Sequence, residues 1–205
     1  MENAVDLNIV LLPDEKTKRQ VIEWSKSIAE QFDTYFVLDG QTLLPHITLY
    51  QARYPIKNQP KIEEKIKIVA ESSTPFTVSM TGFSGHWGFL FADVEVSNEL
   101  RGLHDRIVDE LNPLREGEIA STVKGLTGLT KEQEEAVEKF GYIYAKDTFT
   151  VPHITITRLK NPDQIEQAIK SITQPLFSFE ASTVAIAPTA EHGTCPQPIS
   201  VFNIK

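Results

Sequence analysis

The chain alternates between apolar runs typical of buried strands and apolar residues spaced as on one face of a helix. A short apolar run at residues 7–12 predicts a buried strand near the N-terminus. Val21, Trp24 and Ile28 follow at helical spacing, so residues 14–32 are expected to form an amphipathic helix. The chain is thus predicted to begin with a strand followed by a helix.

The same two patterns predict the remaining elements. Further strands are expected at 43–50, 76–80, 87–96, 149–157, 176–187 and 199–204, with a turn through Gly82 and Gly85 before the strand at 87–96. Helices are expected to begin at the capping or proline signals near 58, 97, 130 and 161. Thr130 and Gln133 have the spacing of a capping box. The stretch 115–128, rich in Gly, Thr and Ser, predicts a loop.

These elements occur in a repeated order. The series strand, helix, strand, strand describes residues 43–96 and again residues 149–204. We therefore predict an α+β fold in one bilobal domain over 1–205, with the lobes built around the strands at 43–50 and 149–157. Each lobe is expected to contain an antiparallel sheet backed by helices, and a pseudo-two-fold axis is expected to relate the two sheets across a central cleft.

An identical tetrapeptide lies in each of these two strands. The sequence Pro-His-Ile-Thr occupies 45–48 and again 152–155, and an aliphatic residue follows each copy. Because side chains alternate along a strand, His46 and Thr48 share one face and the isoleucine between them points to the core. A lone His-x-Thr is common at a strand edge, but two identical copies in matching surroundings favour a functional pair. The two strands are expected to place two imidazoles and two hydroxyls around one cleft.

These residue types suit acid–base chemistry on a phosphate ester. Histidine has an ordinary pKa of about 6.5 and can give or take a proton near neutral pH. Hydrolysis of a phosphodiester needs a base that activates water and an acid that protonates the leaving oxygen, and His46 and His153 can supply both. Thr48 and Thr155 can donate hydrogen bonds to the non-bridging oxygens, where negative charge builds in the transition state. Such a mechanism requires no metal and no other cofactor.

Composition limits the partners and the location. The net charge of −8 argues against a protein that grips long duplex nucleic acid by its phosphates, whereas a small nucleotide or an RNA terminus fits a local pocket. No apolar run approaches the roughly 20 residues needed to span a bilayer. The acidic N-terminus lacks the basic region of a signal peptide, and the single cysteine, Cys195, suits a reducing compartment. We therefore expect a cytoplasmic protein with no membrane partner.

The two His-x-Thr strands resemble those of the 2H phosphoesterase superfamily, which includes RNA 2′,3′-cyclic phosphodiesterases, also called 2′-5′ RNA ligases. Element order agrees over nearly the whole chain, and the helix that contains residues 100–104 is similar to one that follows the central strand in that family. The resemblance implies metal-independent hydrolysis of 2′,3′-cyclic phosphate or 2′-5′ phosphodiester bonds, with ligation as the reverse reaction. It also implies a catalytic set of His46, Thr48, His153 and Thr155. The segment 115–148 looks like an insertion, which could cover or reshape the cleft.

Two further residues are candidates for substrate binding. Arg158 is similar in placement to an arginine of many relatives and could hold a phosphate. Strand alternation from His153 points Arg158 to the opposite face, unless the strand bulges first. Alternation puts Tyr50 on the face of His46 and Thr48, where its ring could stack on a base.

Two other functions remain open on the sequence. The same cleft could retain a nucleotide or a phosphate without turnover, although a protein that only binds would be expected to lose at least one histidine. The two histidines could instead hold a metal ion. A transition-metal centre usually needs a third protein ligand, however, and neither motif contains a carboxylate or a cysteine. The enzyme is therefore the favoured interpretation, and no metal site is expected.

Overall fold

The computed structural model describes residues 3–173 and 176–205. These residues form eight strands: β1 (Ala4–Leu12), β2 (Ile47–Pro55), β3 (Phe76–His86), β4 (Phe89–Val94), β5 (His153–Arg158), β6 (Ser178–Ala181), β7 (Thr183–Pro188) and β8 (Ser200–Asn203). They also form five α-helices: α1 (Glu15–Gln31), α2 (Gln59–Glu71), α3 (Asn98–Leu111), α4 (Lys131–Phe140) and α5 (Ile165–Ser171). The predicted α+β class is confirmed.

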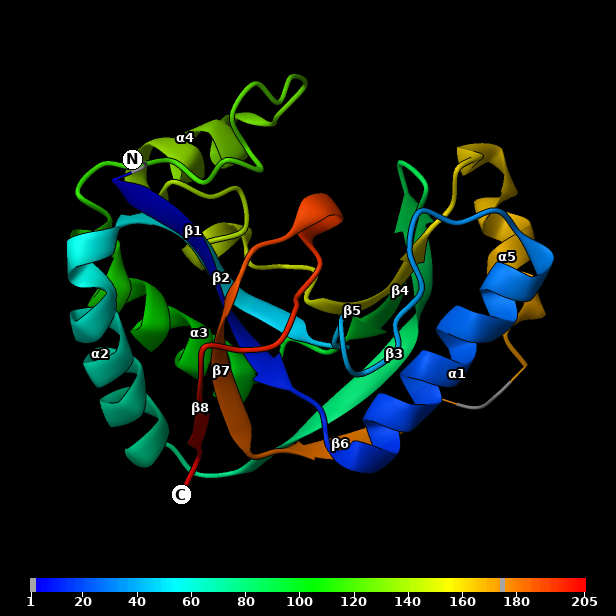
Figure 1. Cartoon of the computed structure of the whole chain (residues 1–205), viewed down its shortest axis with the longest axis horizontal. Helices are drawn as coiled ribbons and strands as arrows, with labels where there is room; N and C mark the ends of the chain where they lie inside the picture. Colours follow the sequence, from blue (N-terminus) through cyan, green and yellow to red (C-terminus); the bar gives the residue numbers. More distant parts are fainter. Residues whose placement is uncertain (1–2, 174–175) are drawn as a thin grey trace.

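The strands of the described residues belong to one antiparallel sheet, which is strongly curled (Figure 1). Their order is β6-β3-β4-β5-β2-β1-β7-β8. We expected two separate sheets, and the structure corrects this, because β2 and β5 meet through the pair Ile47–Ile154. Both isoleucines are fully buried, so the join between the two halves is apolar on its core side. The two motif strands are neighbours at the centre of the sheet.

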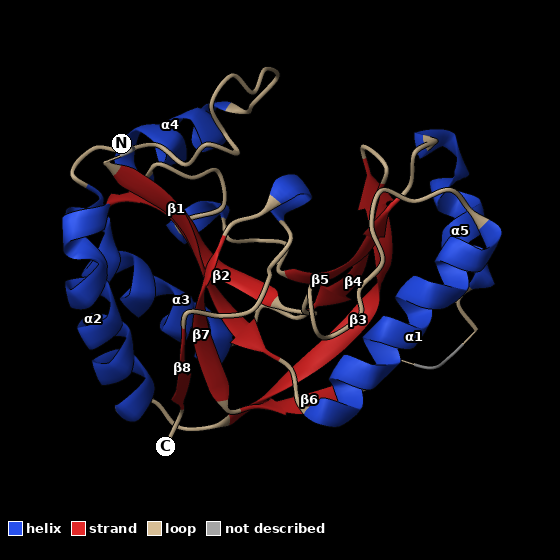
Figure 2. Ribbon diagram, in the orientation of Figure 1, coloured by secondary structure: helices blue, strands red, loops and turns tan. Residues whose placement is uncertain are grey.

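The helices lie on the outside of the curl, as Figure 2 shows. Helix α1 packs against β5 and α5 against β3 and β4, whereas α2 packs against β7 and β8 and α3 against β2. The apolar face predicted for α1 is buried there, with Val21, Trp24 and Ile28 almost fully covered. None of the helices in the described residues is long and apolar enough to cross a membrane.

Three helices begin where the sequence places a capping residue. The Asp14 side chain accepts a hydrogen bond from the Thr17 N–H (2.7 Å) at the start of α1, and the Ser97 hydroxyl accepts one from the Leu100 N–H (3.2 Å) at α3. The predicted capping box is present at the start of α4, which ends at a glycine with positive φ. These signals are local, so the sequence predicts these helix starts correctly.

Two predicted strands need correction. The apolar stretch 176–187 is not one strand, because β6 ends at Ala181 and β7 begins at Thr183, and they pair with β3 and β1 respectively. The motif strands also begin later than predicted, with β2 starting at Ile47 and β5 at His153. The residues before each motif strand instead approach the sheet as irregular chain.

The turn between β3 and β4 also lies elsewhere than predicted. Gly82 and Gly85 fall within β3, and the chain reverses at Trp87 and Gly88, which have φ angles of 52° and 85°. Two consecutive residues with positive φ are typical of a tight β-hairpin. A Cβ atom at Gly88 would lie 2.6 Å from the Leu159 carbonyl oxygen, so only glycine fits beside the neighbouring chain. This hairpin forms one side of the cavity described below.

The segment 115–148 is fixed to one end of β1 and β2. The Ser121 N–H and hydroxyl both donate to the Asp6 carboxylate at 2.7 Å, and Arg53 forms an ion pair with the same carboxylate at 2.6 Å. The Tyr50 hydroxyl donates to the Phe140 carbonyl oxygen at 2.6 Å. These contacts hold the segment beside the β2 motif strand.

Candidate active site

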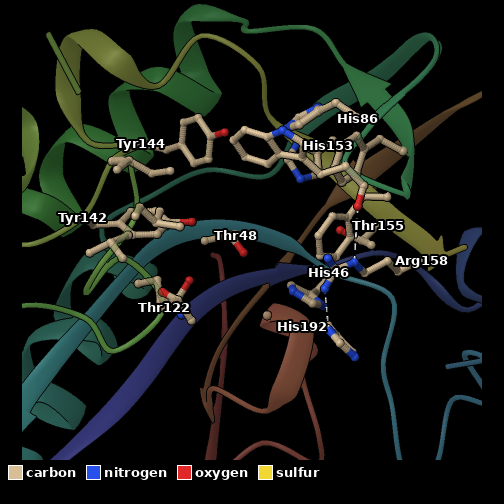
Figure 3. Close-up of a pocket in the computed structure, with 18 residues that line it drawn as sticks. His46, Thr48, His86, Thr122, Tyr142, Tyr144, His153, Thr155, Arg158 and His192 are labelled. Carbon is tan, nitrogen blue, oxygen red and sulfur yellow. Dashed lines mark hydrogen bonds between the residues drawn. The ribbon is translucent and has the colours of Figure 1, made fainter. Parts of the chain in front are cut away.

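The two motif strands place four side chains in a square at the centre of the sheet. The motif isoleucines pair in antiparallel register. Continuing this register by one residue sets His46 opposite Thr155 and Thr48 opposite His153. All four side chains line one cavity, shown in Figure 3. The histidines therefore occupy one diagonal of the square and the threonines the other.

The cavity has a volume of about 490 Å³, within the range typical of small-molecule sites. The β3–β4 hairpin and the start of β4 supply one wall, with His86, Trp87, Phe89 and Phe91. The segment 115–148 supplies another, with Thr122, Val123, Leu126, Tyr142, Ile143 and Tyr144. The loop at 192–193 closes a third side. The segment that the sequence marks as an insertion thus lies directly against the motif residues.

The two motif imidazoles are held by the same hydrogen bond. Nδ1 of His46 lies 2.9 Å from the Leu44 carbonyl oxygen, and Nδ1 of His153 lies 2.8 Å from the Val151 carbonyl oxygen. Because a carbonyl oxygen only accepts, Nδ1 carries the hydrogen in each neutral ring. Nε2 is therefore the nitrogen that is available to a ligand in both histidines.

Burial keeps both rings neutral. It lowers the pKa of His46 to about 4, with the Leu44 carbonyl raising the pKa and the nearby His153 lowering it further. Burial also lowers the pKa of His153, against the opposing effects of the Val151 carbonyl and the Asp93 carboxylate. Both imidazoles are uncharged at neutral pH. An anion placed between them would raise the pKa of these rings.

A hydrogen bond from β1 holds the Thr48 side chain. The Nδ2 group of Asn8, a fully buried residue, donates to the Thr48 hydroxyl oxygen at 3.2 Å. Because that oxygen accepts this bond, the hydroxyl hydrogen is free to point into the cavity. Nothing in the sequence indicates this role, since Asn8 stands within an apolar run that predicts only a buried strand.

Each motif strand bulges directly after its threonine. In β2 the extra residue is Leu49, whose two neighbours pair with consecutive residues of β1. In β5 the extra residue is Ile156, whose two neighbours pair with consecutive residues of β4. A bulge reverses the alternation of side chains beyond it. The fifth residue after each histidine, Gln51 in β2 and Arg158 in β5, therefore lines the cavity.

The bulge in β2 corrects the prediction for Tyr50. This residue is fully buried, and its hydroxyl donates to the Phe140 carbonyl oxygen. A ring without an exposed face cannot stack on a base, so the structure removes Tyr50 from the candidate substrate-binding residues. Gln51, which is not predicted from the sequence, lines the cavity instead. The five-residue spacing that it shares with Arg158 is the sequence signal that could have found it.

Arg158 reaches the cavity because β5 bulges. Its Nη1 lies 2.9 Å from Nδ1 of His192, and its Nε donates to the Trp87 carbonyl oxygen at 3.3 Å. The guanidinium carbon lies 5.2 Å from the ring centre of Tyr35 and 4.6 Å from that of Phe89. An arginine only donates, so Nδ1 of His192 is the acceptor in this contact. Within the described residues, Arg158 supplies the one permanent charge on the cavity wall.

Two histidines outside the motifs also line the cavity. His86 packs against the rings of Trp87 and Phe91 in the hairpin, and His192 packs against Tyr35. Neither histidine has a local pattern around it, and for this reason the sequence did not place them in the site. In the part of the chain that the structure describes, three or more His, Cys, Asp or Glu residues nowhere gather as a metal-binding group.

The fold is one already seen in solved structures. TT0787 of Thermus thermophilus matches with a TM-score of 0.60 and 18% sequence identity, over 97% of each chain. E. coli LigT complexed with phosphate matches with a TM-score of 0.56 and 12% identity, over 100% of this chain and 99% of that one. The same protein complexed with 3′-AMP matches with a TM-score of 0.53 and 13% identity at the same coverage. These structures share the α+β class with a curled antiparallel sheet.

The family is established by sequence. The model of the 2′-5′ RNA ligase superfamily matches residues 17–192, a range that includes both His-x-Thr strands. The chain therefore belongs to the 2′-5′ RNA ligase superfamily, and the 2H phosphoesterase assignment predicted from the doubled motif is confirmed. A search of curated protein sequences gives no match. Membership of this superfamily supports an enzyme of the phosphodiesterase type.

Proposed function

We propose that this protein is a metal-independent phosphodiesterase that hydrolyses 2′,3′-cyclic phosphate or 2′-5′ phosphodiester bonds of RNA ends or small nucleotides. The observation that carries this proposal is the square of two histidines and two threonines on one cavity wall. His46, Thr48, His153 and Thr155 are the proposed catalytic residues. The strand groups β6-β3-β4-β5 and β2-β1-β7-β8 are the proposed pseudo-two-fold lobes of one domain, with the cavity as the cleft between them.

In the proposed mechanism, one motif histidine is the general base and the other is the general acid. Nε2 of the base takes a proton from water, and the water oxygen bonds to phosphorus. The bond between phosphorus and one ribose oxygen breaks, and Nε2–H of the acid gives that oxygen its proton. The diagonal arrangement supports this scheme, because it lets the two Nε2 atoms reach the phosphate from different sides. Each turnover consumes one water, and proton exchange with solvent resets the two rings.

The threonines and Arg158 stabilise the charge in this scheme. Thr48 and Thr155 donate hydrogen bonds to the non-bridging oxygens, where negative charge builds in the transition state. Asn8 supports Thr48 by occupying a lone pair of its hydroxyl oxygen. Arg158 supplies the permanent positive charge and exchanges its contact with His192 for a phosphate oxygen.

Anion binding is expected to take up a proton, because both motif histidines are neutral in the free protein. Sulfate keeps its charge through the neutral range, so its affinity reports on the protein alone. We expect the affinity for sulfate to fall as the pH rises from about 5 to about 7, by up to about tenfold per pH unit for each proton bound. Calorimetry in buffers of different ionisation enthalpy measures the uptake. A double variant, His46→Ala with His153→Ala, should lose this dependence, and a retained slope would assign the proton to another group.

The direct test of the proposed function is hydrolysis of the 2′,3′-cyclic phosphates of adenosine, cytidine, guanosine and uridine in the presence of EDTA. Phosphorus NMR of the product gives the position of the remaining phosphate. We expect turnover that EDTA does not affect. Turnover that appears only with an added metal ion would contradict the metal-independent mechanism. Tight nucleotide binding without turnover of any cyclic or 2′-5′ linked substrate would favour the alternative, a module that only binds.

A further inference from the structure

One end of the cavity has no role in the mechanism proposed above. This end lies where β2 continues past its bulge, beside the segment 115–148. On either side of Gln51, a hydrogen bond joins β2 to that segment: Tyr50 donates to Phe140 and Arg53 donates to Ser121. Arg158 lies toward the opposite end, since β2 and β5 run antiparallel away from their shared pair. Figure 3 shows Tyr142 and Thr122 on one side of Thr48, with Arg158 and His192 on the other.

Gln51 is a buried polar residue whose hydrogen-bonding capacity is largely unused. Only 4% of its surface is exposed, and it lines the cavity. Among the described residues, its side chain makes a single hydrogen bond, from Nε2 to the Thr189 hydroxyl oxygen at 3.3 Å. The amide therefore keeps its oxygen and one N–H for a ligand. Because Gln51 lines the cavity, a ligand there can complete these hydrogen bonds.

Two tyrosines of the segment 115–148, Tyr142 and Tyr144, line the same cavity and also have unused hydrogen-bonding groups. The rings of Tyr142 and Tyr144 lie 5.8 Å apart in an edge-to-face arrangement. Figure 3 shows both hydroxyls directed toward the interior of the cavity, and neither bonds to another described residue. Burial raises the pKa of both tyrosines, so both hydroxyls keep their proton and can donate.

The rest of this end is uncharged and largely apolar. The segment 115–148 adds Thr122, Val123 and Leu126 to the wall, and none of the wall residues that it contributes carries a charge. The cavity end near Arg158, by contrast, has a guanidinium held between two aromatic rings. Among the described residues that line the cavity, Arg158 is the one with a permanent positive charge, so a second phosphate would find no such charge at this end. A flat, neutral group with donors and acceptors on its edge does fit.

We propose that Gln51, Tyr142 and Tyr144 form a subsite for a nucleobase, which selects nucleotides over other phosphate esters. This subsite rests on the proposed function, because that function sets the phosphate at the motif histidines. The tyrosine rings pack against the base, an interaction that is worth about tenfold in affinity per stacked base or more. The Gln51 amide presents a donor and an acceptor side by side, a pattern that complements the hydrogen-bonding edge of a base.

The test compares two ligands that differ only in the base. Adenosine 2′-monophosphate is titrated into the full chain by calorimetry, beside a base-free analogue that has hydrogen at the sugar carbon where the base was attached. We expect the nucleotide to bind at least about tenfold more tightly than the analogue. Gln51→Ala is expected to reduce this difference by about fivefold, and Tyr144→Ala to remove most of it. Neither substitution should change the affinity for the analogue or for inorganic phosphate.

Matched variants decide between outcomes. Lys131→Ala, on the exposed surface of α4 in the same segment, should behave as the unsubstituted protein. Tyr144→Phe removes only the hydroxyl, so it keeps the test valid if Gln51→Ala does not fold. Equal affinities for nucleotide and analogue would overturn the subsite, and so would loss of the base preference in Trp87→Ala but not in Tyr144→Ala. If inorganic phosphate itself does not bind, the proposed function and the subsite both fail.

Discussion

Replacing either motif histidine by alanine is expected to lower kcat/KM for a 2′,3′-cyclic phosphate by about a thousandfold or more. Loss of a general acid or base typically lowers the rate by two to four orders of magnitude. Each motif ring is held in one tautomer by its Nδ1 hydrogen bond, and no neighbouring residue can take its place. KM should change little, because the proposed phosphate-binding residues, the two threonines and Arg158, are unchanged. The double variant, His46→Ala with His153→Ala, should be little slower than either single variant, since groups that act in one step are not additive.

The comparison needs a histidine that lies in the same cavity but outside the square. His86→Ala serves this purpose, because that ring is exposed in the hairpin. We expect its kcat/KM to stay within about tenfold of the unsubstituted protein. Activity of His46→Ala or His153→Ala within that same margin would contradict the two-histidine mechanism.

A substrate with a better leaving group would separate the roles of the two histidines. Nitrophenolate departs without being protonated, so a nitrophenyl phosphodiester does not need the general acid. The variant that recovers activity on this substrate lacks the acid, and the variant that stays inactive lacks the base. The sequence cannot make this distinction, because the two tetrapeptides are identical.

The parts of the fold that the sequence predicted are those with local causes. The start of α1 at Asp14 and the capping box of α4 depend on side chains that contact their own helix ends. The grouping of His46 with Thr48, and of His153 with Thr155, likewise follows from alternation over three residues of one strand. Such short-range rules need no knowledge of which strands become neighbours.

The errors arise where one residue changes a long-range relation. An extra residue at Leu49 turns Tyr50 to the core and Gln51 to the cavity, and nothing in the composition of β2 marks the bulge. The same effect at Ile156 brings Arg158 into the cavity. Apolar residues recur throughout 176–187, so the sequence favours one strand there, although β6 and β7 pair with different strands. The hydrophobic pattern predicts which residues are buried, but it does not predict which strands pair with each other.

Replacing His104 by alanine is expected to destabilise the fold by about 4 kcal/mol, the largest stability effect that we predict for a single site. This fully buried ring joins the bulge of β2 to the end of the segment 115–148. Its Nδ1 lies 2.6 Å from the carbonyl oxygen of Leu49, its Nε2 accepts from the Lys146 N–H at 2.8 Å, and it stacks on Phe149. Alanine would leave both backbone groups unpaired beside a void. Urea unfolding near neutral pH, with exposed His86→Ala as the control, measures the difference.

The same histidine makes the stability depend on pH. Burial lowers the pKa of His104 to about 4, and the pKa of His46 also falls to about 4. An unfolded histidine titrates near 6.5, so this stability is fully present above about pH 6.5 and is lost as the pH falls toward about 4. The free energy of unfolding should decrease over that window by on the order of 3 kcal/mol for each histidine. His104→Ala should be less stable at every pH but show a shallower decrease, because one titrating group is gone. An equal decrease in the variant and the unsubstituted protein would contradict a neutral His104 at the bulge.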